Sequence, residues 1–342
     1  MKRIGVLTGG GDCPGLNPTI RAVVRKAIMD NYAVIGIKNG WKGLIEKETM
    51  HLDLNSTSGI LHRGGTILGT SRTNPFKSQD QLNAVKRNFK ALKLTALVAI
   101  GGEDTLGVAN RLCKHGLHIV GIPKTIDNDL SATDFTFGFD TAVNIAMEAI
   151  DRLHTTAESH HRVMVVEVMG RHAGWIATYA GIAGGADVIL IPEEHIDLNE
   201  VCEILRKRKK RGKNFSIIVC AEGATLKDSD LVLRAQSKDA FGHVLLGGIG
   251  PVLAEKIEEM TGFETRVTVL GHIQRGGSPT AFDRVLSTRY GVKAVELVNA
   301  RQFGKMVCLR GNDISSVPLS KGVGKLKTVD RKLYDIAKIF FG

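Results

Sequence analysis

Two aspartates follow a lysine at the end of an apolar run in residues 121–130, which read GIPKTIDNDL. If this segment is extended, Asp127 and Asp129 lie on the same side of the chain. One carboxylate could then take a proton from a substrate hydroxyl while the other helps to hold a metal ion. Such a pair can equally cap the next segment through Asx turns. Other parts of the sequence must therefore decide between the two interpretations.

Glycine-rich turns follow other apolar runs. GGGDCPG (residues 9–15) and GGEDTLG (101–107) each lead into a helical pattern, and RGGTILGTSR (63–72) adds Arg72. Backbone N–H groups at helix N-termini bind anions, so these turns are suited to phosphate groups. The first two match neither GxxxxGK[ST] nor GxGxxG. This disfavours kinases with a Walker motif and ordinary NAD dehydrogenases.

Further charged residues follow the later strands. MGRHAGW (169–175) and GHIQRGG (271–277) supply Arg171, His272 and Arg275, and arginine binds phosphate through two parallel hydrogen bonds. Glu103 and Glu222 also come at strand ends. Phosphoryl transfer requires a base, magnesium and several cations. Because ligands bind at the carboxyl ends of strands in open α/β sheets, this recurrence predicts one long cleft.

These residues must be positioned by short apolar strands that alternate with helical patterns. A chain of 342 residues is long enough for two lobes, and strands that are apolar throughout predict parallel sheets covered on both faces. Asn17 is expected to cap the first helix, with Pro18 at its first position. We expect strands at residues 3–10, 33–38, 95–102, 118–123, 162–168, 187–192, 216–223, 266–271 and 306–311.

Composition narrows the class of protein. The five cysteines form no CxxC pair, which favours a reducing cytoplasm over a disulfide framework. No apolar run reaches the roughly 20 residues of a membrane span. The net charge of +11 includes the block RKRKKRGK (206–213). Since this block lacks the aromatic residues that stack on single strands, we interpret it as a solvated helix end. We expect no nucleic-acid and no membrane partner.

Seven motifs together, in this order along nearly the whole chain, resemble the phosphofructokinase family. They are GGDCPGLN, GGTILGTSR, GGEDT, PKTIDND, TFGFDTA, ESHHRVMVVEVMGRHAGWIA and LGHIQRGGSPTAFDR. The resemblance implies an α/β fold of two similar Rossmann-like three-layer lobes, with mainly parallel sheets and the active-site cleft between them. It places the phosphoryl-donor lobe at 1–138 plus about 279–327, and the sugar-phosphate lobe at 139–278 plus about 328–342. It also implies Mg²⁺-dependent transfer to the 1-hydroxyl of fructose 6-phosphate.

The resemblance also implies a role for each matching residue. Asp127 resembles the base, and Asp129 and Glu103 the metal-side carboxylates, although most family members have aspartate in place of Glu103. Arg162 and Arg266 resemble arginines that reach a neighbouring subunit's site, which implies a homodimer or homotetramer. The residues that resemble sugar-phosphate contacts are Thr125, Ile126, Met169, Gly170, Arg171, Glu222, His272, Ile273, Gln274 and Arg275. Those that resemble donor-phosphate contacts are Gly10, Gly11 and Arg72.

Two positions bear on the phosphoryl donor, which in this family is ATP or pyrophosphate. The ATP-using pattern has glycine where this chain has Asp104, and commonly also where it has Lys124. A carboxylate about 4 Å from the α-phosphate of a nucleotide would be repelled by about 4 kcal/mol before screening. Lys124 would place a compensating charge beside pyrophosphate. We therefore expect pyrophosphate, with ATP as the alternative donor and sedoheptulose 7-phosphate as a possible second acceptor; NAD kinase is a more distant alternative.

The donor assignment predicts two opposite effects. Asp104→Gly should allow ATP to bind because it removes bulk and a like charge. Lys124→Met should abolish most pyrophosphate-dependent activity because it removes the cation beside that donor. A steady-state assay of both variants with each donor measures both effects. Robust turnover of ATP by the unmodified chain, with none from pyrophosphate, would contradict the assignment.

Overall fold

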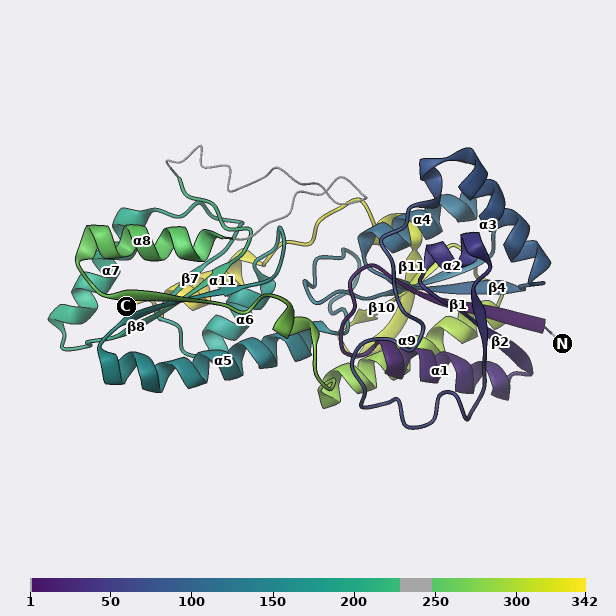
Figure 1. The fold of residues 1–342 in the computed structure, drawn as a ribbon, viewed down its shortest axis with the longest axis horizontal. Helices are drawn as coiled ribbons and strands as arrows, with labels where there is room; N and C mark the ends of the chain where they lie inside the picture. The colour runs from purple at the N-terminus through teal and green to yellow at the C-terminus, as the bar shows by residue number, and fades with distance from the viewer. Residues whose placement is uncertain (1, 228–247) are drawn as a thin grey trace.

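Seven strands form the first sheet in the computed structural model, which describes residues 2–227 and 248–342 (Figure 1). Their spatial order is β11-β10-β5-β4-β1-β2-β3. The inner strands run parallel, whereas β3 and β11 pair antiparallel with β2 and β10 at the two edges. The strands are β1 (Lys2–Gly9), β2 (Tyr32–Ile37), β3 (Thr49–Leu52), β4 (Ala96–Gly101), β5 (Ile119–Pro123), β10 (Lys305–Arg310) and β11 (Asp313–Pro318).

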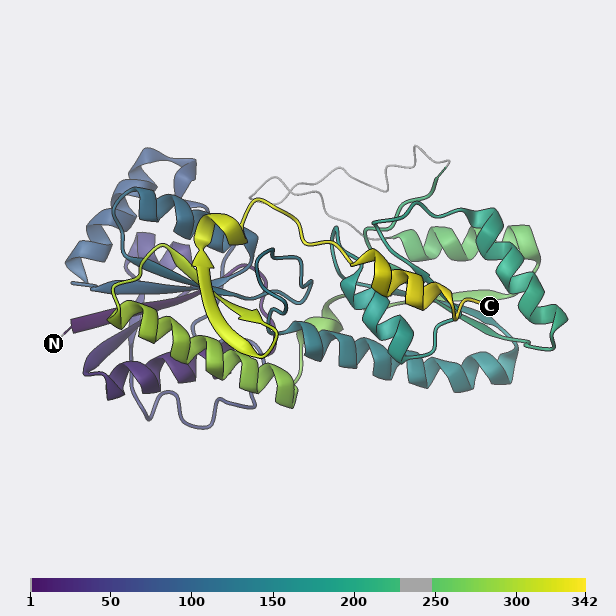
Figure 2. The same ribbon diagram turned by 180° about the vertical axis from the view of Figure 1, so that it is seen from behind.

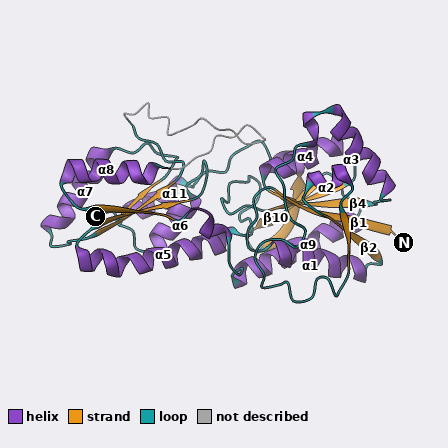
Figure 3. Ribbon diagram, viewed as in Figure 1, coloured by secondary structure: helices purple, strands orange, loops and turns teal. Residues whose placement is uncertain are grey.

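Helices cover both faces of this sheet, as Figure 3 shows. Helices α1 and α9 pack on one face through one hydrophobic core, and α2, α3 and α4 pack on the other through a second. Strand β4 is buried along its whole length, as expected for a parallel strand between two helical layers. The helices are α1 (Leu16–Met29), α2 (Trp41–Glu46), α3 (Gln79–Ala91), α4 (Glu103–Lys114), α9 (Ala281–Asn299) and the short α10 (Leu319–Gly322).

A second, four-stranded sheet forms the other lobe, in the order β7-β8-β6-β9. All of its strand pairs are parallel. Helices α5 and α6 cover one face, and α7 and α8 the other. Its elements are α5 (Phe139–His160), β6 (Val163–Val168), α6 (Trp175–Ala183), β7 (Val188–Leu190), α7 (Leu198–Lys210), β8 (Ser216–Ala221), α8 (Ile249–Thr261), β9 (Thr265–Val269) and α11 (Arg331–Lys338).

The predicted fold class is confirmed, because two mainly parallel sheets with helices on both faces form two lobes. The chain crosses between the lobes before α5, again between the 3₁₀ turn Gly271–Arg275 and α9, and finally between α10 and α11 (Figure 2). The sequence did not predict the antiparallel edge strands β3 and β11, whose partly exposed residues lack the apolar runs of the inner strands.

The predicted helix cap at Asn17 is wrong. Helix α1 begins at Leu16, and its N-cap is Gly15, at φ 111°. A Cβ at Gly15 would lie 2.5 Å from the ring of Phe137, so the close approach requires glycine. The Asn17 amide instead donates to the carbonyls of Arg63 and Gly64, both at 3.1 Å. Asn17 therefore fastens the glycine turn of residues 63–72 to α1.

The basic block at residues 206–213 is exposed except for the half-buried Arg208, and some of its side chains contact their own lobe. Arg208 forms an ion pair with Asp187 at 2.7 Å and donates to Ser216 Oγ at 3.0 Å. The ammonium of Lys209 lies 4.0 Å from the centre of the Phe263 ring. These contacts use part of the block to hold α7 against its neighbours. Among the described residues, no helix is long and apolar enough to cross a membrane.

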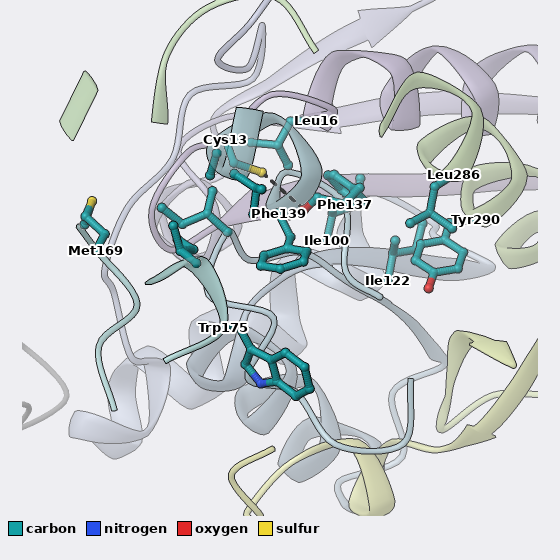
Figure 4. Packing of buried hydrophobic residues seen from close by; sticks show 14 of the residues in the cluster. Cys13, Leu16, Ile100, Ile122, Phe137, Phe139, Met169, Trp175, Leu286 and Tyr290 are labelled. Carbon is teal, nitrogen blue, oxygen red and sulfur yellow. Dashed lines mark hydrogen bonds between the residues drawn. The ribbon is translucent and has the colours of Figure 1, made fainter. Parts of the chain in front are cut away.

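Helices α5 and α9 cap each other where the first two crossings meet. The buried carboxylate of Asp283, in the first turn of α9, accepts hydrogen bonds from Thr141 N (2.9 Å) and Thr141 Oγ1 (2.5 Å). In return, Asp140 Oδ2 accepts from Thr280 Oγ1 at 2.5 Å, and Thr280 is the N-cap of α9. Figure 4 shows the adjoining core, in which Cys13 Sγ donates to the carbonyl of Phe137. Polar capping and apolar packing therefore fix the same junction.

The Asp283 cap gives stability a defined pH dependence. Burial raises the pKa of Asp283 to about 6 from 3.8. The stability that comes from protonated Asp283 is therefore fully present below the pKa that this residue has in the unfolded chain. It is lost as the pH rises through the pKa of Asp283 in the folded protein. The shift corresponds to about 3 kcal/mol. Urea unfolding between about pH 4 and 7 should show the wild type losing stability relative to Asp283→Asn as the pH rises, and a constant difference would contradict this.

Candidate active site

The turns after β1, β4 and β5 converge at one edge of the first sheet. Because these strands are adjacent and parallel, their carboxyl ends lie side by side. Together with Arg72 and two arginines from the second lobe, the turns line one cleft. Its lining residues are Gly10, Gly11, Asp12, Arg72, Gly102, Glu103, Asp104, Thr105, Lys124, Thr125, Ile126, Asp127, Asp129, Arg171 and Arg275. The predicted donor, base and metal residues therefore do meet in one place.

Lys124 is a buried cation between two of these turns. Its side chain is 4% exposed, its N–H donates to Gly101 O at 3.0 Å, and its ammonium donates to Gly11 O. Burial lowers the pKa of Lys124, and Arg275 lowers it further, whereas Asp127 opposes the shift. An anion bound in the cleft would favour the charged form of this lysine.

Within the part of the chain that the structure describes, only one carboxylate oxygen of Asp127 has a hydrogen-bond partner. The residue is 5% exposed, and its Oδ2 accepts a hydrogen bond from Thr125 Oγ1 at 3.3 Å. The Asp127 N–H donates to the same hydroxyl at 3.1 Å, which fixes the turn. Oδ1 is buried and has no hydrogen-bond partner among the described residues. This oxygen is suited to accept a proton from a substrate hydroxyl.

The segment that carries the two aspartates is not extended, so the condition under which they would share one side of the chain is not met. Asn128, between them, has φ 50°, in the left-handed region, so the simple alternation of side chains does not apply. Both Asp127 and Asp129 still line the cleft. Burial raises the pKa of Asp129 to about 7, and the charges of Asp127 and Glu103 raise it too, while Arg171 lowers it. A divalent cation would relieve this repulsion between carboxylates.

Glu103 and Asp104 lie in the first turn of α4, where the helix dipole favours negative charge. Glu103 is exposed at the rim, and its Oε1 accepts a hydrogen bond from Gly324 N at 3.0 Å. Among the described residues, no three His, Cys, Asp or Glu side chains form a metal-binding cluster. The oxygen donors of Asp129 and Glu103 suit Mg²⁺, which uses few carboxylates together with water and phosphate oxygens.

In the second lobe, a strained turn carries Arg171 into the cleft. Gly170 has φ 144° and Arg171 has φ 52°. Glu222 Oε1 accepts a hydrogen bond from Arg171 N at 3.1 Å, so Glu222 supports this turn and is not among the residues that line the cleft. Burial raises the pKa of Glu222 to about 7, and the charge of Asp127 adds to the effect. Met169 precedes the same turn and is buried.

In the turn that follows β9, one residue lines the cleft and another supports the neighbouring backbone. Arg275 Nη1 reaches across to Asp12 O at 3.4 Å. Gln274 is fully buried; it accepts from Met169 N at 3.4 Å and donates to Gly271 O at 3.1 Å. The side chain of Gln274 therefore supports the backbone and does not line the cleft. His272 and Ile273 are exposed.

Arg162 and Arg266 are not brought to the cleft of their own chain. Arg162 precedes β6, whereas the Arg171 turn follows that strand, so the two arginines lie at opposite ends of it. Arg162 Nη2 and Arg266 Nη2 both contact Glu264 Oε1, at 2.7 and 2.6 Å. Their expected role in the site of a neighbouring subunit stays a prediction.

Sequence reasoning missed three residues of the cleft, namely Asp12, Gly102 and Thr105. Asp12 lies within the glycine-rich turn GGGDCPG, and its place in that turn could have identified it as a residue of the cleft. Thr105 is buried against β1 and β4, since a Cβ at Gly9 or Gly101 would lie 2.6 or 2.4 Å from it. Thr105 therefore explains why both strands end in glycine.

The Arg171 turn yields a test that leaves every charged side chain intact. A Cβ at Gly223 would lie 1.9 Å from Arg171 O, so Gly223→Ala must displace the turn. We expect kcat to fall by about tenfold or more, since small displacements of positioning groups cost that much. The control is Gly107→Ala within α4, where a Cβ would meet no atom of the described residues within 4 Å. A wild-type kcat in Gly223→Ala, with circular dichroism unchanged, would contradict the role of the turn.

Comparisons with known proteins agree with this geometry. The pyrophosphate--fructose 6-phosphate 1-phosphotransferase of Streptomyces coelicolor is 59% identical, over 99% of this chain and 100% of that protein. The same organism's ATP-dependent 6-phosphofructokinase 3 is 52% identical, over 97% and 98% of the two chains. A crystal structure of pyrophosphate-dependent phosphofructokinase from Nitrosospira multiformis has the same fold, with a TM-score of 0.85 and 21% identity over 100% of this chain and 91% of that one.

Family-level comparison gives the same result over most of the chain. The family model described as "Phosphofructokinase" matches residues 3–298. This range contains every residue that lines the cleft. The chain belongs to the phosphofructokinase family.

Proposed function

We propose that this chain transfers a phosphoryl group from pyrophosphate to the 1-hydroxyl of fructose 6-phosphate. The products are fructose 1,6-bisphosphate and phosphate, and the reaction is reversible. The observation that carries the proposal is that Asp104 and Lys124 line the same cleft as Asp127. A relative named for the pyrophosphate reaction, 59% identical to this chain, supports it.

In the proposed mechanism, Asp127 accepts the proton of the sugar hydroxyl. Thr125 fixes Oδ2 and the backbone of Asp127, so Oδ1 faces the reaction in a set orientation. The hydroxyl oxygen then attacks the terminal phosphorus of pyrophosphate, and the bond from that phosphorus to the bridging oxygen breaks. Lys124, Arg72 and Arg171 balance the negative charge that moves to the leaving phosphate.

The donor side of the cleft favours a short anion. Asp104 lies where the sequence pattern of ATP users has glycine, and it adds a negative charge to the first turn of α4. The ammonium of Lys124 between the two glycine turns offers a compact cation to pyrophosphate. Mg²⁺ would be held by Asp129 and Glu103 and would neutralise donor oxygens when bound.

The proposal also covers the oligomeric state, the location in the cell and a second acceptor. Arg162 and Arg266 would complete the sugar-phosphate site of a second copy, so we propose a homodimer or homotetramer that acts in the cytoplasm. The ion pairs of both arginines with Glu264, at the end of β6 away from the cleft, support this arrangement. Sedoheptulose 7-phosphate is a further candidate acceptor.

The decisive test is a donor assay on the unmodified chain with Mg²⁺ in both directions. We expect turnover of fructose 6-phosphate with pyrophosphate, and release of pyrophosphate from fructose 1,6-bisphosphate and phosphate. ATP should give a kcat/KM at least about tenfold lower, which corresponds to only about 1.4 kcal/mol of the repulsion from Asp104. The specific alternative is ATP, because a relative at 52% identity is named as ATP-dependent. A preference for ATP would overturn the donor assignment while leaving the acceptor chemistry in place.

A further inference from the structure

The segment 324–329 connects α10 to α11, and we call it the strap. It passes from the first lobe to the second, as Figure 2 shows. Its backbone N–H groups make three contacts: Gly324 N donates to Glu103 Oε1 at 3.0 Å, Lys327 N to Asp129 O at 2.9 Å, and Val329 N to Glu193 Oε1 at 2.9 Å. Leu326 also pairs with Leu130 as an antiparallel bridge. The strap therefore contacts, in chain order, Glu103 at the rim of the cleft, the loop between β5 and α5 that carries Asp127 and Asp129 (the aspartate loop), and the second lobe. All three contacts lie within six residues.

The side chain of Lys327 is bound to the aspartate loop. Its Nζ donates to Asn128 Oδ1 at 3.1 Å, to Thr133 O at 3.0 Å and to Asp134 O at 2.7 Å. An ammonium has three protons and no acceptor, so the three acceptors match its full capacity. Asn128 is the left-handed residue between Asp127 and Asp129. Lys327 thus fixes the residue on which the relative placement of the two carboxylates depends.

The same residue is also bound to the second lobe. Lys327 O accepts a hydrogen bond from Trp175 Nε1 at 2.8 Å, and its Nζ lies 5.1 Å from the centre of the Trp175 ring. Glu193 Oε1, which accepts from Val329 N, also accepts from Gly174 N at 3.0 Å. Gly174 and Trp175 begin α6, directly after the turn that carries Arg171. One lysine therefore joins the aspartate loop to the start of α6.

We propose that Lys327 is a positioning residue, which holds the Asp127–Asp129 loop in register with the Arg171 turn of the other lobe. The inference rests on the proposed function, because it assigns to these two elements the base and a phosphate-binding arginine. Lys327 does not itself line the cleft. It acts through Asn128 and Trp175. Its loss should therefore impair the geometry of transfer more than the affinity for either substrate.

The test replaces Lys327 by methionine, which keeps an unbranched side chain, one atom shorter, but removes the three donors. For Lys327→Met we expect kcat to fall by about 10- to 100-fold, as for a displaced catalytic group. KM for pyrophosphate and for fructose 6-phosphate should change by less than about threefold, because the cleft-lining contacts remain. The matched control is Lys325→Met, on the same strap with an exposed side chain, which should keep wild-type kcat. Wild-type kcat in Lys327→Met would overturn the proposal, and so would an increase in KM at unchanged kcat.

A second pair of variants keeps the test decisive if Lys327→Met does not fold. Lys327→Arg retains the charge, but its planar guanidinium fits three converging acceptors less well. Trp175→Phe keeps a ring and removes the hydrogen bond to Lys327 O. Both should lower kcat by about three- to tenfold with KM unchanged, in samples whose thermal unfolding and oligomeric state match the wild type. Wild-type kcat in both variants would overturn the proposal.

The wild-type assay separates the two proposals from each other. If the unmodified chain turns over ATP and not pyrophosphate, the proposed donor fails, and the same variants are then compared with ATP. The ratio of variant to wild-type kcat with the active donor tests the strap in either case. A wild type inactive with both donors would overturn the strap proposal together with the proposed function, because the aspartate loop would then perform no transfer.

Discussion

The parallel register of β1, β4 and β5 is the constraint on which the cleft depends. Gly9 pairs with Gly101, and Gly101 pairs with Pro123, so the three strands reach their carboxyl ends at the same level. The turns that follow are brought together by the hydrogen bonds of the sheet, and the contact between the Lys124 ammonium and Gly11 O joins two of them. Thr105 packs where these strands end and leaves no room for a Cβ at either glycine. A shift in strand register would separate Lys124 from the glycine turn to which it donates.

The ionisable groups in and around the cleft carry both signs, so cationic and anionic ligands would each stabilise the charged form of one set. Burial and the charge of Asp127 raise the pKa of Asp129 in the cleft and of Glu222 behind the Arg171 turn, while burial and Arg275 lower the pKa of Lys124. In each of the three groups the protonation equilibrium is therefore shifted towards the neutral form. A magnesium ion together with a phosphate anion, as in the proposed reaction, would favour the charged forms of both sets at once.

Sequence reasoning succeeded where function is concentrated in short, contiguous turns. The inner strands are apolar runs with a chemical signal at their ends, so both the fold class and the meeting of Lys124, Asp127 and Arg171 followed from the pattern. Local geometry was less predictable. The left-handed Asn128 and the glycine cap of α1 depend on distant partners, namely Lys327 and Phe137. The edge strands and the supporting role of Gln274 likewise arise from tertiary contacts that leave little trace in local sequence.

The order of the strands has a consequence for the synthesis of this protein. Strand β10 is the parallel partner of β5 and is followed by the edge strand β11, yet both are encoded after the whole second sheet. While the chain emerges from the ribosome, one edge of β5 thus stays without its partner until residues 305–310 are made. An unpaired edge strand is a template for wrong association. The strap comes later still, so the aspartate loop acquires this support only after residues 324–329 have been made.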